Sequence, residues 1–388
     1  MRGKFLEDSS MQQRVLLLLM FVCVISSSCF KKHAVNTNAL LQQRACLESI
    51  ELKDYARAQT HCELCLEYDS SMPECLNGIG IIALIYKDEE KALRFFSQAL
   101  RQNNDFCEAR NNLGSIYFSH GDFDKAGKFF DRALEINPSN TDARYNSALS
   151  HFRLAERRKA GDDIKKSLKH LGIAKEQINK LLALEPNYTS AYRDLGLIEL
   201  NRYDLAEFMH ERQILLNSAE KAFTKCLVIE SENDGCHEGL AQVHVENGHF
   251  DKAFAQYFLC LSHDSYNSAC RKGIGLAFEK SSHAEKGYEN FRKVLKSDSK
   301  NAFAHEAFCA ALFERGLDTQ AREQCHAAIG LKQDLCSAHF RLAEHYANIY
   351  NDELARRHCR QFLICDGKKA TLNAQNRCRE ILVSVRRS

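Results

Sequence analysis

Small residues recur along the chain at a nearly constant interval. The interval is 34 residues from Ala58 to Ala126 and from Ala219 to Ala355, and it lengthens to 48 and 45 residues on either side of Ala174. In most units a large-small pair precedes this position by 13 residues, and an aromatic residue follows it by four. These spacings are helical and place small residues where two helices meet. A fixed period of this length predicts repeated helix pairs, which overrides a division into ordinary domains.

The repeat predicts an all-α architecture. Nine units cover residues 39–369, and the two longer intervals place insertions in the fourth and fifth units. The inserted segments have helical composition, so we expect longer helix pairs there. Gly121 and Gly316 stand where a turn between two helices is expected, and Pro138 and Pro186 stand at the ends of second helices. Residues 370–388 are predicted to form a C-terminal cap helix, which an open array needs.

One unit carries a fuller repeat signature than the others. The segment from Cys107 to Asn140 resembles the tetratricopeptide repeat at nearly every signature position except the tryptophan. The resemblance implies a right-handed superhelical solenoid of about nine helix-turn-helix repeats, whose first helices line a concave groove. The signature residues are Leu113, Gly114, Tyr117, Gly121, Ala126, Phe130, Ala133 and Pro138.

An apolar run near the N-terminus has the organisation of an export signal. Val15 to Ile25 contains no polar residue, follows Arg14, and precedes three serines and Cys29. This run is too short to span a bilayer, which takes about 20 helical residues, so residues 1–28 are predicted to be a signal peptide. The small residues before Cys29 resemble the lipobox of bacterial lipoproteins, which implies acylation of Cys29 and a short linker over residues 29–38. Cleavage without acylation and an uncleaved anchor are the alternatives.

Composition and motifs exclude several functions. Lys and Arg number 53 and Asp and Glu 51, and a net charge of +2 does not suit a polybasic nucleic-acid binder. The sequence contains no HExxH, GxSxG, CxxCH or Gly-rich phosphate loop. We therefore expect a non-catalytic protein with no cofactor, no metal site and no small-molecule substrate.

Ten of the 17 cysteines form couples that are in register with the repeat. Three couples ten residues apart connect neighbouring units, and two couples 16 residues apart lie within one unit. This pairing favours disulfides, and hence an oxidising compartment; each short bridge is worth about 2–3 kcal/mol by the loop-entropy estimate. The alternative is that cysteine fills alanine positions as a small apolar residue. The couples are Cys65–Cys75, Cys226–Cys236, Cys260–Cys270, Cys46–Cys62 and Cys309–Cys325, whereas the pairing of Cys336, Cys359, Cys365 and Cys378 stays open.

Apolar residues occupy positions that would line the groove of the first five units. The ninth and twelfth residues of each unit are apolar in nine of ten places. An exposed apolar stripe favours binding of an amphipathic helix or an extended apolar peptide; the alternative is that some of these side chains pack between first helices. The groove does not resemble the carboxylate clamp of chaperone-binding relatives, because the fifth position supplies one cation, Arg193. The stripe residues are Leu47, Ile81, Leu149, Leu197, Ile50, Leu84, Phe118, Phe152 and Leu200.

The leader, Cys29 and the repeat array together resemble the outer-membrane lipoproteins of type IV pilus assembly and stability, the PilF/PilW/Tgl type. The resemblance implies a pilotin that binds an apolar region of a secretin monomer and promotes its assembly. It also implies a lipid anchor in the outer membrane, facing the periplasm; a soluble periplasmic or secreted protein is the alternative. A second hypothesis is a periplasmic adaptor that docks cell-wall hydrolases or proteases.

Overall fold

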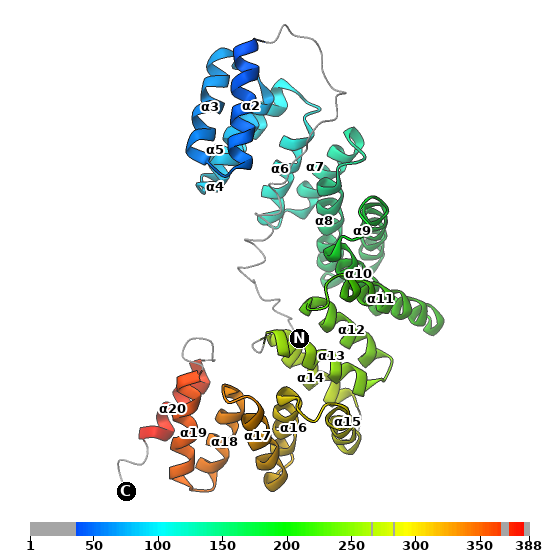
Figure 1. The fold of residues 1–388 in the computed structure, drawn as a ribbon. Coiled ribbons are helices and arrows are strands. Elements are labelled where there is room, and N and C mark those ends of the chain that lie inside the picture. The colour runs from blue at the N-terminus through cyan, green and yellow to red at the C-terminus, as the bar shows by residue number, and fades with distance from the viewer. Residues whose placement is uncertain (1–35, 265–266, 282–283, 366–371, 384–388) are drawn as a thin grey trace. The chain divides into compact units, whose positions relative to one another are not determined.

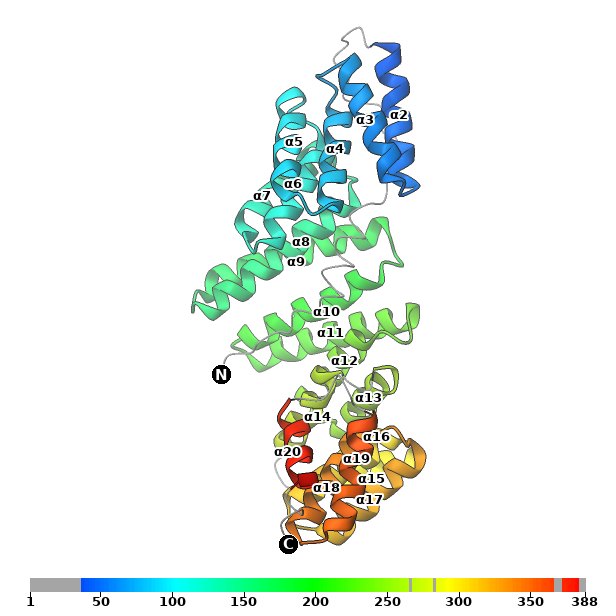
Figure 2. The same cartoon turned by 90° about the vertical axis from the view of Figure 1, so that its left-hand side faces the viewer.

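The computed structural model describes residues 36–264, 267–281, 284–365 and 372–383. Every regular element in these ranges is an α-helix (Figure 1). α2 to α19 form nine pairs in this part of the chain, and α20 follows the last pair. Within a pair the second helix returns alongside the first, as α2 with α3 and α4 with α5 in Figure 2. The predicted all-α array of tetratricopeptide-type helix pairs is therefore confirmed.

The helices divide into two compact units between Ala191 and Tyr192. The first unit contains α2 (Thr37–Glu51), α3 (Tyr55–Tyr68), α4 (Pro73–Ile85), α5 (Glu89–Gln102), α6 (Cys107–Ser119), α7 (Phe123–Ile136), α8 (Thr141–Ala160) and α9 (Ile164–Leu184). The helix α10 (Thr189–Leu205) begins just before the division. The second unit continues with α11 (Met209–Ile229), α12 (Asp234–Glu246), α13 (Phe250–His263), α14 (Ser268–Lys280), α15 (Ala284–Ser297), α16 (Ala302–Glu314), α17 (Asp318–Leu331), α18 (Cys336–Asn348), α19 (Asp352–Cys365) and α20 (Leu372–Val383).

The turns inside the helix pairs of the first unit share one construction. A residue in the left-handed region ends the turn, and an aspartate follows it as N-cap of the second helix. In α6–α7, for example, Gly121 has φ +73° and Asp122 accepts a hydrogen bond from the backbone N–H of Lys125. Glycine suits the first position because it has no Cβ penalty at positive φ, and aspartate suits the second because it satisfies an otherwise unpaired N–H group. The prediction of a turn at Gly121 is confirmed.

Close helix approach explains the small residues of the repeat. A Cβ added to Gly80 would lie 2.5 Å from the ring of Phe96, and one added to Gly114 would lie 2.6 Å from the ring of Phe130. Both rings are fully buried, with exposed fractions of 0% and 1%. The small residue of the first helix thus makes room for the aromatic residue of the second, because protein interiors are closely packed.

The middle of the chain contains the longest helices. α8 has 20 residues, α9 and α11 have 21 each, and α10 has 17, whereas α4 to α7 have 13 or 14. The insertions in the fourth and fifth units therefore lengthen helices, as the sequence predicts. At the C-terminal end, α20 lies within the predicted cap segment and contacts α18 and α19.

The predicted signal peptide over residues 1–28, the acylation site at Cys29 and most of the linker over residues 29–38 lie outside the described residues. Within the described ranges, none of the helices combines the length and the apolar character needed to cross a bilayer.

Candidate protein-binding site

Disulfides connect successive helix pairs. Three of them join the last turns of a second helix to the first turn of the next first helix, as the ten-residue spacing predicts. Their Cα atoms lie 6.3 to 6.5 Å apart, within the range that a disulfide spans. They are Cys65–Cys75 from α3 to α4, Cys226–Cys236 from α11 to α12, and Cys260–Cys270 from α13 to α14.

Four more disulfides link helices within a pair or at the C-terminal end. Cys46–Cys62 joins α2 to α3 and Cys309–Cys325 joins α16 to α17, with Cα atoms 5.1 and 5.3 Å apart, as the 16-residue spacing predicts. The structure also decides the pairing of the four C-terminal cysteines, which the sequence left open. They form Cys336–Cys365, from α18 to α19, and Cys359–Cys378, from α19 to α20.

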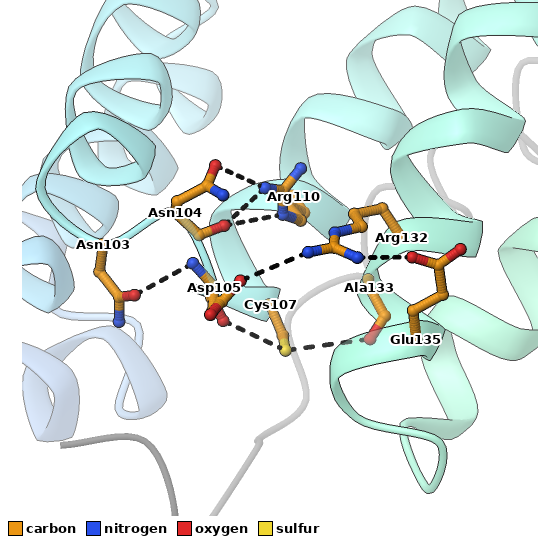
Figure 3. Close-up of polar contacts among 8 residues, drawn as sticks. All are labelled: Asn103, Asn104, Asp105, Cys107, Arg110, Arg132, Ala133 and Glu135. Carbon is orange, nitrogen blue, oxygen red and sulfur yellow. Dashed lines mark hydrogen bonds and ion pairs between the residues drawn. The ribbon is translucent and has the colours of Figure 1, made fainter.

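In the first unit, two connections between successive helix pairs have alanines at the two positions, ten residues apart, where other connections have a disulfide. Ala99 with Ala109, and Ala133 with Ala143, are fully buried. Beside the second couple, the thiol of Cys107 lies 3.9 Å from the carbonyl oxygen of Ala133 (Figure 3). At these two connections, small apolar side chains therefore fill the space that a disulfide fills elsewhere.

Polar contacts also connect α7 to the loop before α6, near Cys107. The thiol also lies 3.6 Å from the carbonyl oxygen of Asp105, and the Asp105 carboxylate lies 3.8 Å from the guanidinium of Arg132 (Figure 3). Arg132 pairs in turn with Glu135 at 2.7 Å. The loop before α6 is thereby tied to the end of α7.

Three of the nine residues of the predicted apolar stripe are packed into the array. Ile50, Phe152 and Leu200 have only 9%, 7% and 4% of their surface exposed, so the prediction that they line an open groove is wrong. They lie between helices because an apolar side chain gains more from neighbouring helices than from water; Ile50, for example, belongs to the cluster that contains Cys46 and Ile79. Of the others, Leu47 is 37% exposed, and Ile81, Leu84, Phe118, Leu149 and Leu197 are half-buried.

Three carboxylates lie in the first turns of α4, α6 and α8. Glu74, Glu108 and Asp142 are each the second residue of their helix and are half-buried. Burial, and then the charge of Glu185, raises the pKa of Asp142 to about 6. Burial also raises the pKa of Glu74, with smaller contributions from Glu108 and Asp69. A helix N-terminus would by itself favour the charged form, so burial outweighs the helix dipole at these two residues.

Four asparagines form a hydrogen-bonded row next to the carboxylates. The Nδ2 group of Asn112 donates to Oδ1 of Asn77 at 2.9 Å, and Nδ2 of Asn146 donates to Oδ1 of Asn111 at 3.2 Å. These bonds connect α6 to α4 and α8 to α6. Among the described residues, Nδ2 of Asn77 and Asn111 and Oδ1 of Asn112 and Asn146 have no further hydrogen bond. The row therefore offers both donors and acceptors to a ligand.

The carboxylates and the amides share one helix face. In α6, Glu108 precedes Asn111 and Asn112 by three and four residues, and this spacing places side chains on the same side of a helix. Glu74 and Asn77 repeat the arrangement in α4, and Asp142 and Asn146 repeat it in α8. We call this surface the amide face: Glu74, Asn77, Glu108, Asn111, Asn112, Asp142 and Asn146.

The first helices of the second unit present different chemistry at the corresponding positions. Glu238, Lys272 and Glu306 stand where α4 and α6 carry Asn77 and Asn111. Glu306 pairs with Arg271 at 3.3 Å, and burial raises the pKa of Glu238. The row of asparagines therefore belongs to the first unit.

Histidines connect the helices of several pairs, a role that the sequence alone does not indicate. His237 of α12 contacts Gln256 of α13 at 2.7 Å, and the same contact recurs 19 residues apart in other pairs. In α18–α19 both partners are histidines, with 2.9 Å between the Nδ1 atoms of His339 and His358. The 19-residue recurrence is visible in the sequence once the helix pairs are known. In the part of the chain that the structure describes, no three His, Cys, Asp or Glu side chains converge as metal ligands.

Residues 107–140 match the family model described as the tetratricopeptide repeat. This segment is a tetratricopeptide repeat. It begins at the first residue of α6 and ends at Asn140, the N-cap of α8. Most of the other pairs repeat its 34-residue spacing, so the tetratricopeptide array holds the candidate site on three consecutive first helices.

Solved tetratricopeptide structures are similar to the chain in fold. TTC0263 of Thermus thermophilus is 20% identical, with 53% of this chain and 99% of that chain covered and a TM-score of 0.38. The type IV pilus biogenesis factor PilW is 18% identical, with 61% and 98% covered and a TM-score of 0.47. PilF of Pseudomonas aeruginosa is 14% identical, with 62% and 97% covered and a TM-score of 0.48. No curated protein matches the sequence.

Proposed function

We propose that the chain is a non-catalytic scaffold that binds a protein partner on the amide face of its first unit. The observation that carries this proposal is the row of asparagine side chains with spare hydrogen-bonding groups on adjacent helices. These spare groups are accessible to solvent, and a bound polypeptide supplies both N–H and C=O groups that can pair with them. Tetratricopeptide arrays are protein-interaction scaffolds, which agrees with this use of the surface.

Site-specific photocrosslinking in the native cell tests the proposal. A photoreactive amino acid at Ser115, seven residues after Glu108 on α6, lies on the amide face. The same group at Lys128, exposed on α7, serves as the control. We expect a crosslinked protein from the first position and none from the second. Equal crosslinking at both positions, or none at Ser115, contradicts the proposal.

We further propose that the scaffold works in an oxidising compartment, anchored in the outer membrane through Cys29. The seven disulfides among the described residues support an oxidising location, because the reducing cytosol keeps thiols reduced. Mass spectrometry of the mature protein tests both parts: an acylated Cys29 supports the anchor, and an alkylation pattern that spares the bridged cysteines supports the location. An unmodified N-terminus beyond residue 28 would instead indicate a soluble periplasmic or secreted protein.

The finer role that we propose is that of a pilotin, in which the bound partner is a secretin monomer. The support is the resemblance of the leader and the repeat array, together with a fold shared with the pilus proteins named above. Because the amide face carries the spare hydrogen-bonding groups, the partner segment would bind through polar groups. Deletion of the gene should abolish secretin multimers in the outer membrane. Normal multimers, combined with crosslinking to a cell-wall hydrolase or protease, would favour the periplasmic adaptor.

A further inference from the structure

We propose that the amide face binds an extended polypeptide segment with a lysine or arginine at about every third residue. This inference rests on the proposed function and names the chemistry of the partner. It differs from the apolar partner that the sequence favours.

The sign of the charge follows from the three carboxylates. Glu74, Glu108 and Asp142 form no ion pair with any cation in the described part of the chain. Partial burial penalises the charged forms of Glu74 and Asp142, and their raised pKa values are the consequence. A role limited to the helix dipole would not explain a raised pKa. A cationic side chain on the partner would stabilise all three charges.

The extended form of the partner follows from the asparagines. Asn77 and Asn111 are only 5% and 8% exposed, yet each keeps an unpartnered amide N–H group. Asn112 and Asn146 each keep a carbonyl oxygen beside them. A helical partner has already used its backbone groups, whereas an extended segment has N–H and C=O groups to offer. The alternation of donors and acceptors along the row therefore selects an extended backbone.

The spacing of the cations follows from the packing of the helices. α4 contacts α6, and α6 contacts α8, so neighbouring axes lie about 8–10 Å apart. An extended chain advances about 3.3 Å per residue, and one turn of polyproline II helix covers about 9 Å in three residues. A cation at every third residue therefore meets one carboxylate per helix.

Fluorescence anisotropy with synthetic peptides tests the proposal on the disulfide-bonded full chain. The probe is a labelled peptide of about 15 residues that repeats Lys-Thr-Ser, a length that spans the three helices. One comparison peptide has the same composition with the lysines clustered, and another has glutamate in place of lysine. We expect the spaced peptide to bind at least about tenfold more tightly than the clustered one, and the glutamate peptide not to bind.

Two sets of variants locate the binding. Combined Glu74→Gln, Glu108→Gln and Asp142→Asn should weaken binding of the spaced peptide about tenfold or more. A charge-matched control combines exposed acids from elsewhere in the first unit, Glu51→Gln, Glu67→Gln and Glu90→Gln, and should change the affinity less than about twofold. Asn112→Ala with Asn146→Ala should weaken the spaced and clustered peptides alike, because both lose backbone contacts.

Several results would overturn the proposal. Equal affinity for the spaced and clustered peptides would mean unspecific attraction, and no binding of the spaced peptide would exclude this partner chemistry. These two results use only the native chain, so they hold even where a variant fails to fold. Crosslinking at Ser115 is independent of them: a partner captured there without peptide binding would leave the proposed function standing and refute its cationic, extended ligand.

Discussion

The histidine pair between α18 and α19 predicts acid sensitivity in the second unit. The Nδ1 atoms of His339 and His358 lie 2.9 Å apart, so one of these nitrogens donates an N–H group and the other accepts it. Both rings are more than nine-tenths buried. A proton on the accepting nitrogen replaces the acceptor with a donor. A proton on His358 places a buried charge beside Arg357 and His326.

The magnitude follows from the pKa of His358. Burial, and then the neighbouring His339, His326 and Arg357, lowers this pKa from 6.5 to about 4. Between pH 6.5 and about pH 4, His358 therefore binds a proton in the unfolded chain but not in the folded chain. The free energy of unfolding falls as pH drops through this window and levels off below it. One pKa unit corresponds to about 1.4 kcal/mol, so the loss at about pH 5 is on the order of 2 kcal/mol.

Two substitutions exchange the pairing between helix pairs. His358→Gln gives α18–α19 the His–Gln pair of α16–α17, where His305 contacts Gln324 at 2.7 Å. Between neutral pH and about pH 5, the free energy of unfolding of this variant should fall by about 2 kcal/mol less than that of the native chain. Gln324→His makes the converse change and should add a comparable acid-dependent loss.

Urea unfolding with intact disulfides, followed by far-ultraviolet circular dichroism, measures these differences. Hydrogen exchange of the α18 and α19 amides assigns the change to this helix pair. If His358→Gln retains the full loss on acidification, the His339–His358 pair does not control the acid response, and the assignment of its hydrogen bond is wrong.

Three further predictions concern the first unit. Replacing Cys65 and Cys75 together by alanine should lower the free energy of unfolding by about 3 kcal/mol, measured in urea. The reason is that the unfolded chain gains the conformational entropy that the disulfide removes by closing a loop of eleven residues. Gly114→Ala should lower the melting temperature at a cost of about 1–3 kcal/mol, since its Cβ would lie 2.6 Å from Phe130; an unchanged melting temperature would contradict this packing. Asp142→Asn should raise stability by roughly 3 kcal/mol at neutral pH and leave it unchanged in acid, where the carboxyl is already protonated. A pH-independent gain would exclude the raised pKa as the cause.

The sequence by itself determined the repeat, the helix class and five of the disulfides. Each of these depends on spacing along the chain. A 34-residue period fixes which helix follows which, and cysteines ten residues apart span one turn between stacked pairs, so Cys65 can reach few positions other than Cys75. The lengthened α8 and α9 followed from an insertion that kept helical composition.

Only the tertiary structure decided which side of each first helix meets a neighbour. Ile50 and Leu47 both occupy predicted groove positions, yet the first is buried and the second is exposed. Asn77 and Asn112 lie 35 residues apart in the sequence. They meet because α4 and α6 are each rotated about their own axis so that these two side chains face each other. A repeat pattern specifies the order and spacing of helices but not their rotation, which side-chain packing sets. Since that rotation selects the side chains that face a partner, the candidate site emerged from the structure.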